Sequence, residues 1–203
     1  MPPSQIMREN GLDCLLYLVH PDNLESIMCH GILPYNAVRH HGLDHTSIAS
    51  EEVQKRRDFY ITGVPCHDFV PLYLARRNPM LWAIGDRPRA YIRVRLEVAD
   101  EEDVIFADGN AASKSIDFVR GDFGARRLPW NVILAPRWTG SRYPDGTRQR
   151  CSEVLVPHPI TCDQFLDIRV DLSRQFSFPS DKSQMLRNAP AFISTDPLPG
   201  EGR

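Results

Sequence analysis

The chain has 203 residues, 42% of them hydrophobic, and a formal net charge of −2 at pH 7. This length and composition predict one domain with a substantial core, and the near-neutral charge excludes a protein whose whole surface attracts nucleic acid. The charge is unevenly spread, because residues 97–108 contain six acidic side chains and no Lys or Arg, whereas residues 120–150 contain seven Arg and two Asp. The basic segment indicates either a face that meets a polyanion or a solvated loop with scattered Arg.

Cysteine spacing and hydropathy exclude two further classes of protein. The five Cys are scattered without a CxxC pair, so we expect no disulfide framework. No apolar run approaches the roughly 20 residues of a membrane span, and the first residues lack the basic-then-apolar pattern of a signal peptide. We therefore expect a soluble, cytoplasmic and monomeric protein.

The first predicted elements are a strand, a turn and a short helix. Residues 14–19 (CLLYLV) form an apolar run typical of a strand. A helix is expected from Leu24 onward, capped by Asp22 or Asn23 and ended by Gly31.

The middle of the chain alternates polar segments with short elements. Residues 35–50 are polar and are expected to form a loop, whereas residues 50–57 (SEEVQKRR) suit a helix capped by Ser50, with acidic side chains first and basic ones last. Apolar or alternating runs predict strands, and Pro71 indicates an edge strand or a strand start. The predicted strands are 69–74, 90–98, 104–106, 154–156 and 165–170.

Three further segments complete the expected fold. Residues 111–119 are compatible with a helix, residues 130–134 with a helix or buried segment, and residues 139–146 (TGSRYPDG) with a loop. Many short strands and few helices predict an α+β fold with a mainly antiparallel sheet. We expect one domain over residues 1–172, followed by an irregular, proline-containing tail over residues 173–203.

Glu153 has the strongest catalytic logic in the chain. It opens the apolar run 153–156 (EVLV), which follows the Arg-rich 148–150 (RQR) after Cys151 and Ser152, so a buried strand would hold its carboxylate rigidly. A carboxylate in such a place stabilises a developing positive charge and removes a proton from an acceptor. The alternative is an exposed Glu on an edge strand.

Other side chains suit the parts of a nucleotide. Strand ends and helix starts suit ribose hydroxyls and amides, a guanidinium binds a pyrophosphate, and an aromatic ring stacks on a base. The candidates are His20 and Asn23 for the sugar, Arg56 or Arg57 for the phosphates, and Phe69 or Tyr73 for the base. Each also has a structural alternative: a cap, a solvated helix end or a core position.

Metal and thiol chemistry are not expected. His41 and His45 have the spacing of helical metal ligands, with His40 beside them, but Gly42 opposes a helix and no HExxH acid is present. Cys151 has no assigned His base to make it a nucleophile.

The order of several motifs along the chain resembles the DarT family of bacterial toxins, which ADP-ribosylate DNA bases using NAD. The resemblance runs from about residue 15 to about residue 170, and the stretch from His67 to Tyr73 followed by Asn78-Pro79-Met80-Leu81 is its most specific part. The motifs are HPDNL with GIL at 20–33, KRR at 55–57, HDFVPLY with NPML at 67–81, FADGNA at 106–111 and SEVLV at 152–156.

The resemblance implies a compact ADP-ribosyltransferase fold with a sheet split around an NAD cleft. It implies that Glu153 is the catalytic glutamate and Arg57 the essential arginine, and that His20 and Asn23 contact NAD. Phe69 and Tyr73 then become candidates for stacking on NAD, which serves as co-substrate without a metal.

The loop before Glu153 would contact the acceptor strand, together with Met80 across the cleft. The DNA-contact candidates are Met80, Arg142, Tyr143, Arg148, Arg150 and Cys151, since arginines suit a phosphate backbone and a tyrosine suits a stacked base. Cys151 stands where family members usually carry Gln, and the segment between Arg57 and His67 is shorter than usual. Both departures put the identity of the acceptor in question.

The resulting prediction is an enzyme that transfers ADP-ribose from NAD to a base of single-stranded DNA. As a family resemblance it implies a toxin of a toxin–antitoxin or phage-defence pair, with a macrodomain antitoxin as partner. The alternatives are the same chemistry on RNA or protein, a plain NAD glycohydrolase, and a catalytically silent nucleic-acid-binding module.

Overall fold

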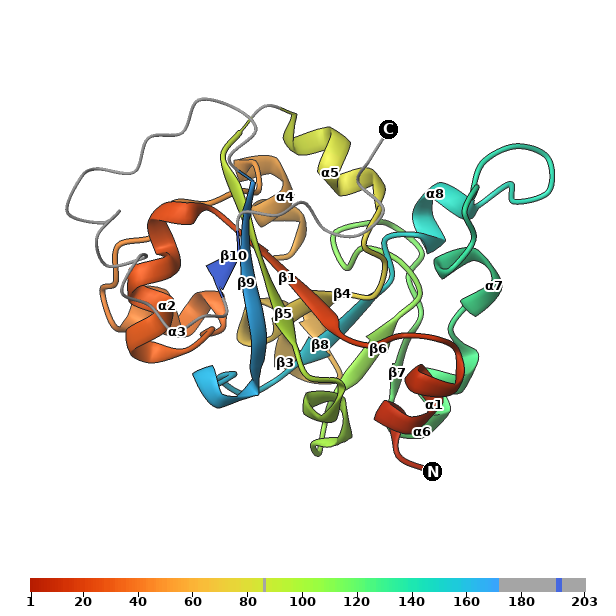
Figure 1. Ribbon diagram of the computed structural model, residues 1–203, viewed down its shortest axis with the longest axis horizontal. Helices are drawn as coiled ribbons and strands as arrows, with labels where there is room; N and C mark the ends of the chain where they lie inside the picture. The colour runs from red at the N-terminus through yellow and green to blue at the C-terminus, as the bar shows by residue number, and fades with distance from the viewer. Residues whose placement is uncertain (86, 172–192, 195–203) are drawn as a thin grey trace.

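The centre of the molecule is a sheet of eight strands in the order β10-β9-β5-β1-β4-β8-β6-β7 (Figure 1). The computed structural model describes residues 1–85, 87–171 and 193–194. Neighbouring strands are antiparallel except β9 and β10, which are parallel. The strands are β1 (Leu15–Val19), β4 (Val70–Tyr73), β5 (Arg89–Val94), β6 (Ile105–Ala107), β7 (Phe118–Arg120), β8 (Glu153–Val156), β9 (Phe165–Asp171) and β10 (Ile193–Ser194), and a separate hairpin joins β2 (Tyr60–Ile61) to β3 (Val64–Pro65).

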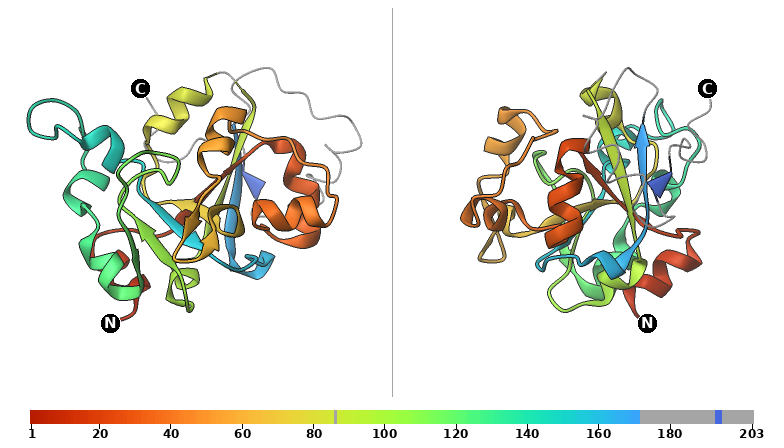
Figure 2. Two further views of the ribbon diagram at one scale, coloured as in Figure 1. Left: turned by 180° about the vertical axis from the view of Figure 1, so that it is seen from behind. Right: turned by 60° about the vertical axis from the view of Figure 1, so that its left-hand side comes forward.

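Short helices surround this sheet. Figures 1 and 2 show α1 and α6 side by side at one end and α2 and α3 together at another. The α-helices are α1 (Pro3–Glu9), α2 (Leu24–His30), α3 (Tyr35–His40), α4 (Glu51–Arg56), α5 (Pro79–Ile84), α6 (Gly121–Arg127), α7 (Trp130–Ile133) and α8 (Gly146–Gln149), and 3-10 helices cover Pro21–Asn23, Cys66–Asp68, Leu96–Asp100 and Cys162–Gln164. The predicted α+β class is confirmed.

The sheet divides between β1 and β4. Strand β1 pairs with β5 along its whole length but with β4 only at Leu16 and Tyr73. Pro71, the second residue of β4, therefore lies in the part of this strand that pairs with β8 alone, opposite Leu155. The prediction that Pro71 marks an edge or a strand start is confirmed locally, because β1 does not pair with β4 at this position and no amide hydrogen is needed there.

The two larger clusters of the apolar core lie on the two faces of β8. Val154 belongs to the larger cluster, with Leu15 and Ile92, and Leu155 belongs to the smaller one, with Phe69 and others near the β2–β3 hairpin. Side chains two residues apart share a face of a strand, so Glu153 projects on the same face as Leu155. All four residues of β8 are buried, and a glutamate at this position is enclosed by the fold.

Three local predictions fail for identifiable reasons. The expected loop 35–50 begins with α3, which contains no buried residue and so has no apolar period to detect. The strand expected over 90–98 ends at Val94 and is followed by the 3-10 helix Leu96–Asp100. Residues 111–115 form turns and bends rather than a helix, with Ser115 at a φ of 61°, a value that interrupts a helix, and residues 118–119 already belong to β7.

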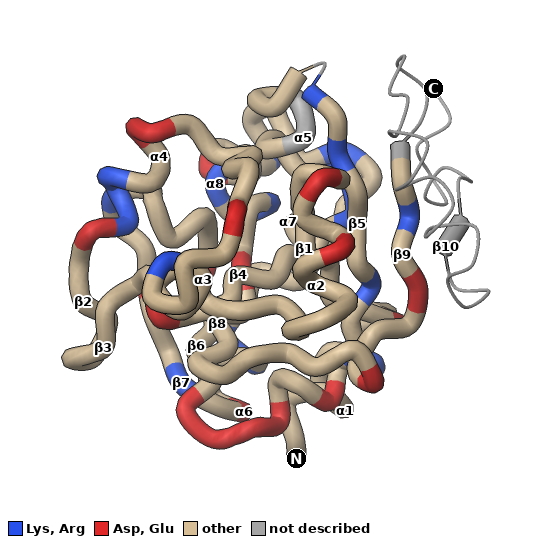
Figure 3. Tube along the Cα trace, turned by 90° about the vertical axis from the view of Figure 1, so that its left-hand side faces the viewer, with Lys and Arg blue, Asp and Glu red and all other residues tan. Residues whose placement is uncertain are grey.

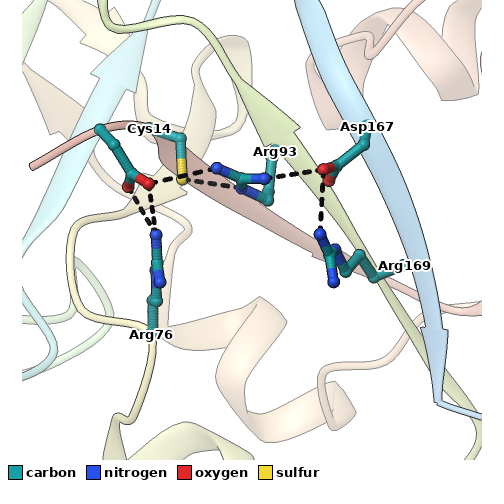
Figure 4. A network of polar contacts seen from close by, with 6 residues as sticks. Cys14, Arg76, Arg93, Asp167 and Arg169 are labelled. Atoms are coloured by element: carbon teal, nitrogen blue, oxygen red, sulfur yellow. Dashed lines mark hydrogen bonds and ion pairs between the residues drawn. The ribbon is translucent and has the colours of Figure 1, made fainter. Parts of the chain in front are cut away.

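An ion network, here called the outer network, links β5 and β9 with the segments before β1 and after β4 (Figure 4). Arg93 of β5 lies 2.7 Å from Asp167 of β9 and 3.2 Å from Asp13, which precedes β1. Arg76 binds Asp13 at 2.5 Å, and Arg169 lies 3.4 Å from Asp167. The network therefore connects four segments that are distant in sequence.

Two other predictions concern the ends and the surface. The tail predicted over 173–203 lies outside the described residues apart from Ile193–Ser194, which pair with β9. Within the described part of the chain, none of the helices combines the length and apolar character needed to cross a membrane.

Candidate active site

Glu153 occupies the first position of β8 in the middle of the sheet. Its backbone pairs with Tyr73 of β4 and Ala107 of β6. Neighbours on both sides fix the strand, and the side chain is fully buried, with 0% exposure. A carboxylate in such surroundings requires both opposite charge and hydrogen-bond donors.

Arg57 supplies the opposite charge. It follows α4, whose first turn is capped by the Ser50 hydroxyl accepting from the Val53 amide at 3.3 Å, and whose acidic start and basic end are visible in Figure 3. The Nη2 atom of Arg57 donates to both carboxylate oxygens of Glu153, at 2.7 and 2.8 Å. Arg56 pairs instead with the exposed Glu52, so the structure brings Arg57, not Arg56, to Glu153.

Two further donors hold the same carboxylate. The side-chain amide of Asn110 donates to Glu153 Oε1 at 3.0 Å, and the backbone amide of Ala111 donates to Oε2 at 3.1 Å. The Asn110 oxygen in turn accepts from the Ala112 amide at 2.9 Å, which fixes its orientation. Asn110 belongs to the FADGNA motif but had no predicted role, because a polar turn residue carries no catalytic signal of its own.

The electrostatics of the site follow from its burial. Burial raises the pKa of Glu153 above its ordinary value, although the charge of Arg57 and the hydrogen bonds oppose this shift. Burial alone would lower the pKa of Arg57, but the charge of Glu153 reverses the effect and the net shift is upward. Burial and the nearby Glu153 charge raise the pKa of Tyr73 well above its usual range, so Tyr73 stays a neutral phenol.

A cleft leads from the surface to this pair. It lies between the end of β1, helices α2 to α4 and strand β4. The predicted co-substrate residues His20, Asn23, Arg57, Phe69 and Tyr73 all line it. These residues come from three separate segments, and the fold gathers them at one place.

Asn23 contributes to the cleft by holding a loop. Its side-chain oxygen accepts from the Thr46 amide at 2.9 Å, and its NH2 group donates to the Thr46 carbonyl at 2.9 Å and lies 3.2 Å from His45 Nδ1. Because the backbone amide identifies the Asn23 oxygen, the NH2 group must donate to His45, whose Nδ1 is then unprotonated. Burial also lowers the pKa of His45. Asn23 is not the side-chain cap predicted for α2.

One wall of the cleft was missed from the sequence. Tyr35 of α3 contacts the rings of His45 and His67, with centroids 6.1 and 5.0 Å apart, and all three residues line the cleft. The polar segment 35–50 was expected to be only a loop, so its aromatic and imidazole side chains had no assigned place. The available signal in the sequence was that this segment is rich in Tyr and His.

A second hollow adjoins the cleft on the side of the predicted acceptor loop. Its lining includes Arg56, Met80, Asn110, Arg148 and Cys151. Met80 and Asn110 also line the cleft, so the two spaces meet beside Glu153. Three predicted DNA-contact residues, Met80, Arg148 and Cys151, are thus placed together. Arg148 is tied to Asp108 at 2.8 Å and Asp145 at 2.6 Å.

The other residues predicted to contact DNA differ in their exposure. Arg142 is exposed and lies 5.4 Å from the ring centroid of Tyr143 at the tip of the loop before α8. Arg150 is only 7% exposed and donates to the carbonyls of Arg77, Val132 and Ile133. The assignment of Arg150 as a DNA contact is corrected, because its guanidinium is enclosed by protein groups.

Cys151 and the histidines show no reactive arrangement. Burial raises the pKa of the Cys151 thiol to about 12, which keeps it protonated at neutral pH. Among the residues that the structure describes, no three His, Cys, Asp or Glu side chains cluster as metal ligands.

Sequence comparison places this geometry among known proteins. A family model described as "ssDNA thymidine ADP-ribosyltransferase, DarT" matches residues 16–175. The chain is 26% identical over 151 residues to a DNA ADP-ribosyl transferase–DNA ADP-ribosyl glycohydrolase fusion protein of Thermosipho africanus (strain H17ap60334), covering 70% of this chain and 38% of that protein. It is 27% identical over 144 residues to a DNA ADP-ribosyl transferase of Thermus aquaticus (strain ATCC BAA-2747 / Y51MC23), covering 63% and 64% respectively. The chain thus spans less than two thirds of either relative.

Solved structures share the fold. The TM-score is 0.72 to Thermosipho africanus DarTG in complex with ADP-ribose, at 21% identity, covering 90% of this chain and 49% of that chain. It is 0.65 to Thermus sp. 2.9 DarT in complex with ADP-ribosylated ssDNA, at 24% identity, covering 77% and 80%. The family model covers most of the chain, and the chain therefore belongs to the DarT family.

Proposed function

We propose that this protein transfers ADP-ribose from NAD to the base of a thymidine in single-stranded DNA. The observation that carries the proposal is the Arg57–Glu153 pair, with Asn110 as an added donor, at the meeting point of two hollows. Thermus sp. 2.9 DarT is described both in complex with NAD+ and in complex with ADP-ribosylated ssDNA, and the family description names thymidine.

The cleft fits a dinucleotide by its chemistry. Arg57 offers a guanidinium for phosphate oxygens, and Tyr73, Phe69 and the Tyr35 ring offer apolar faces for planar groups. Asn23 holds the loop over the cleft rather than presenting a free amide. We therefore assign Asn23 a role in shaping the site.

Transfer exchanges one glycosidic bond for another. The bond from the ribose carbon to nicotinamide breaks, with the electron pair leaving on nicotinamide, and a new bond forms from that carbon to the acceptor base. Glu153 stabilises the positive charge that develops on the sugar and takes the proton that the acceptor loses. Glu153 is raised in pKa by burial, so it accepts this proton more readily than an exposed glutamate.

Arg57 also governs access to Glu153. The carboxylate is fully covered in this structure, with Arg57 against both of its oxygens. A shift of Arg57 toward substrate phosphates would uncover it while keeping the positive charge close. Arg57 is thus both a binding group and the cover of the catalytic carboxylate.

The second hollow is the proposed acceptor side. It lies next to Glu153 and carries Arg56 and Arg148 at its lining, which suit phosphates of a strand. A base inside a duplex hides its reactive edge, so the acceptor must be unpaired. Cys151 lines this hollow in place of the family's usual Gln, and the chain's preference among DNA acceptors depends on this position.

The first experiment incubates purified protein and NAD with single-stranded oligonucleotides that contain or lack thymidine, and measures intact mass. We expect a mass increase of one ADP-ribose only with thymidine, lost in Glu153→Gln. Adducts on RNA or protein but on no DNA would overturn the acceptor assignment. NAD loss that does not depend on any acceptor would indicate a glycohydrolase, and unchanged NAD would indicate a silent binding module.

We further propose a biological setting for this activity. Modified DNA obstructs replication in the cytoplasm, so the protein would act there as a toxin, countered by a macrodomain partner. One relative is a fusion with a DNA ADP-ribosyl glycohydrolase, which supports this pairing. Induced expression should arrest growth with the wild-type chain and not with Glu153→Gln, and co-expression of a DNA ADP-ribosyl glycohydrolase should restore growth. Equal toxicity of both chains would contradict the proposal.

A further inference from the structure

Arg150 is a buried cation without an acidic partner among the described residues. Its Nε donates to the Arg77 carbonyl at 2.6 Å, and Nη1 donates to the carbonyls of Val132, at 3.2 Å, and Ile133. Its guanidinium carbon lies 4.6 Å from the ring centroid of Trp138. Burial lowers the pKa of Arg150 to about 10, which shows that keeping this charge inside the protein is unfavourable.

The groups around Arg150 define the base of one loop. We call residues 138–149 the acceptor loop. Its first part, residues 138–145, projects from the body between α7 and α8 (Figures 1 and 2), and its last part is α8 itself. At its start, Trp138 is 6% exposed and stacks on Arg150, which directly follows the loop. A Cβ atom on Gly146 would lie 1.8 Å from the Trp138 carbonyl oxygen. The two ends of the loop are therefore packed against each other.

Arg150 also connects this loop to the opposite wall of the acceptor side. Arg77, whose carbonyl it binds, precedes Met80 by three residues, and Met80 lines the second hollow across from Arg148. Val132 and Ile133 belong to α7, just before the loop. One planar guanidinium therefore sets the position of α7, the segment before Met80 and the start of β8 relative to one another.

We propose that Arg150 is a positioning residue that shapes the acceptor side and directs ADP-ribose to DNA rather than to water. The inference rests on the proposed function. Arg148 and Cys151 flank Arg150 in the sequence and both line the second hollow, so a shift of Arg150 moves them. In contrast, the cleft residues Asn23 and Arg57 bind the Thr46 backbone and the Glu153 carboxylate, respectively. The loss of Arg150 should consequently affect the acceptor before it affects NAD.

Lysine cannot replace arginine in this role. A guanidinium presents five donors in a fixed plane, whereas an ammonium group is a point charge without a flat face. Arg150→Lys keeps the charge but loses the bridge between carbonyls from separate segments and the flat contact with Trp138. It therefore separates geometry from charge.

The test measures two rates for each variant: NAD hydrolysis without DNA, and transfer to a thymidine-containing oligonucleotide. For Arg150→Lys we expect kcat/KM for the oligonucleotide to fall about tenfold or more, largely through KM, while hydrolysis changes less than about twofold. Trp138→Leu should behave like Arg150→Lys, and Trp138→Phe, which keeps a ring face, should retain most of the transfer. Arg126→Lys, on the exposed side of α6, is the matched control.

A further variant leaves both Arg150 and Trp138 unchanged. Gly146→Ala forces the loop ends apart, because its Cβ collides with backbone, and should reduce transfer selectively if loop position matters. If hydrolysis and transfer fall in parallel in all these variants, or if transfer is unchanged, the inference is wrong. If the wild-type protein makes no DNA adduct at all, the proposed function fails instead, and the two failures are distinguishable.

Discussion

Two arginine–carboxylate groups in this protein share their chemistry and differ in their surroundings. In the site, Arg57 and Glu153 are 11% and 0% exposed, and one buried carboxylate receives every donor. In the outer network, Arg93 and Asp13 are 17% and 58% exposed, and the charge is shared with further residues (Figure 4). The first group concentrates its interactions on one reactive carboxylate, and the second distributes them between strands.

The pKa shifts of the two carboxylates have opposite signs. Burial raises the pKa of Glu153 above 4.5 despite Arg57. Partial burial would also raise the pKa of Asp13, but the hydrogen bond and charge of Arg76 outweigh it, and the pKa lies below 3.8. Ionised Glu153 therefore lowers the stability of the fold and ionised Asp13 increases it. The contrast indicates that an ion pair marks a reactive site when its carboxylate is kept ionised although burial disfavours the charge.

The largest expected effect comes from neutralising one carboxylate of the site and comparing the result with the same change in the outer network. Glu153→Gln should reduce ADP-ribosyl transfer at least about 100-fold, since it removes the charge that stabilises the sugar cation. Asp167→Asn makes the same chemical change in the outer network and should leave transfer within about twofold of wild type. Oligonucleotide mass spectrometry measures both. Equal losses in the two variants would mean that the site does not differ from the network in function.

The added donor at the site predicts the next largest effect. Asn110→Ala removes the 3.0 Å hydrogen bond to Glu153 and should reduce kcat/KM about tenfold, the typical magnitude for one hydrogen bond to a charged group. It should also move the acid limb of the pH–rate profile to higher pH, because a donor to the ionised form is lost. Asn10→Ala, at the end of α1, is the control. An unchanged limb would show that Asn110 does not act on Glu153.

The sequence was informative where the chemistry is local. The strand at Glu153, the Ser50-capped helix before Arg57 and the turn-rich acceptor loop follow from patterns within a few residues. The pairing of Arg57 with Glu153 was implied only by a family resemblance, since 96 residues separate them and only the sheet brings them together. Composition and periodicity do not indicate such a long-range contact.

The remaining misses share one cause, which is competition between local signals and tertiary packing. Helix α3 has no buried face, so its pattern was invisible although Tyr35 forms a wall of the cleft. In the sequence Arg150 cannot be distinguished from Arg148. In the structure Arg148 binds the carboxylates of two partly exposed aspartates, whereas Arg150 binds backbone carbonyls inside the protein. Identical residues two positions apart thus received opposite environments from the fold.

A smaller effect separates the two carboxylates by pH in the wild-type protein. Because Glu153 must be ionised to act and its pKa is raised, kcat/KM should fall on acidification with a midpoint above the ordinary pKa of a glutamate. The stability that Asp13 contributes is present above the ordinary pKa of an aspartate and is lost only as pH falls through its lowered pKa. Rates and circular dichroism measured over the same pH range should show activity lost while the protein is still folded. Coincident loss of both would contradict the assignment of the acid limb to Glu153.

The smallest expected effect is on the network itself. Asp13 is more than half exposed, with 58% of its side chain accessible, so solvent screening limits its value, and Asp13→Asn should lower the free energy of unfolding by about 1 kcal/mol or less at pH 7. High salt should weaken the difference, and it should vanish as pH falls below the pKa of Asp13, because both proteins are then neutral at this position. Urea unfolding at several pH values measures this. Transfer activity should be unaffected, so a variant that lost activity without losing stability would show that the outer network, like the buried pair, serves the reaction.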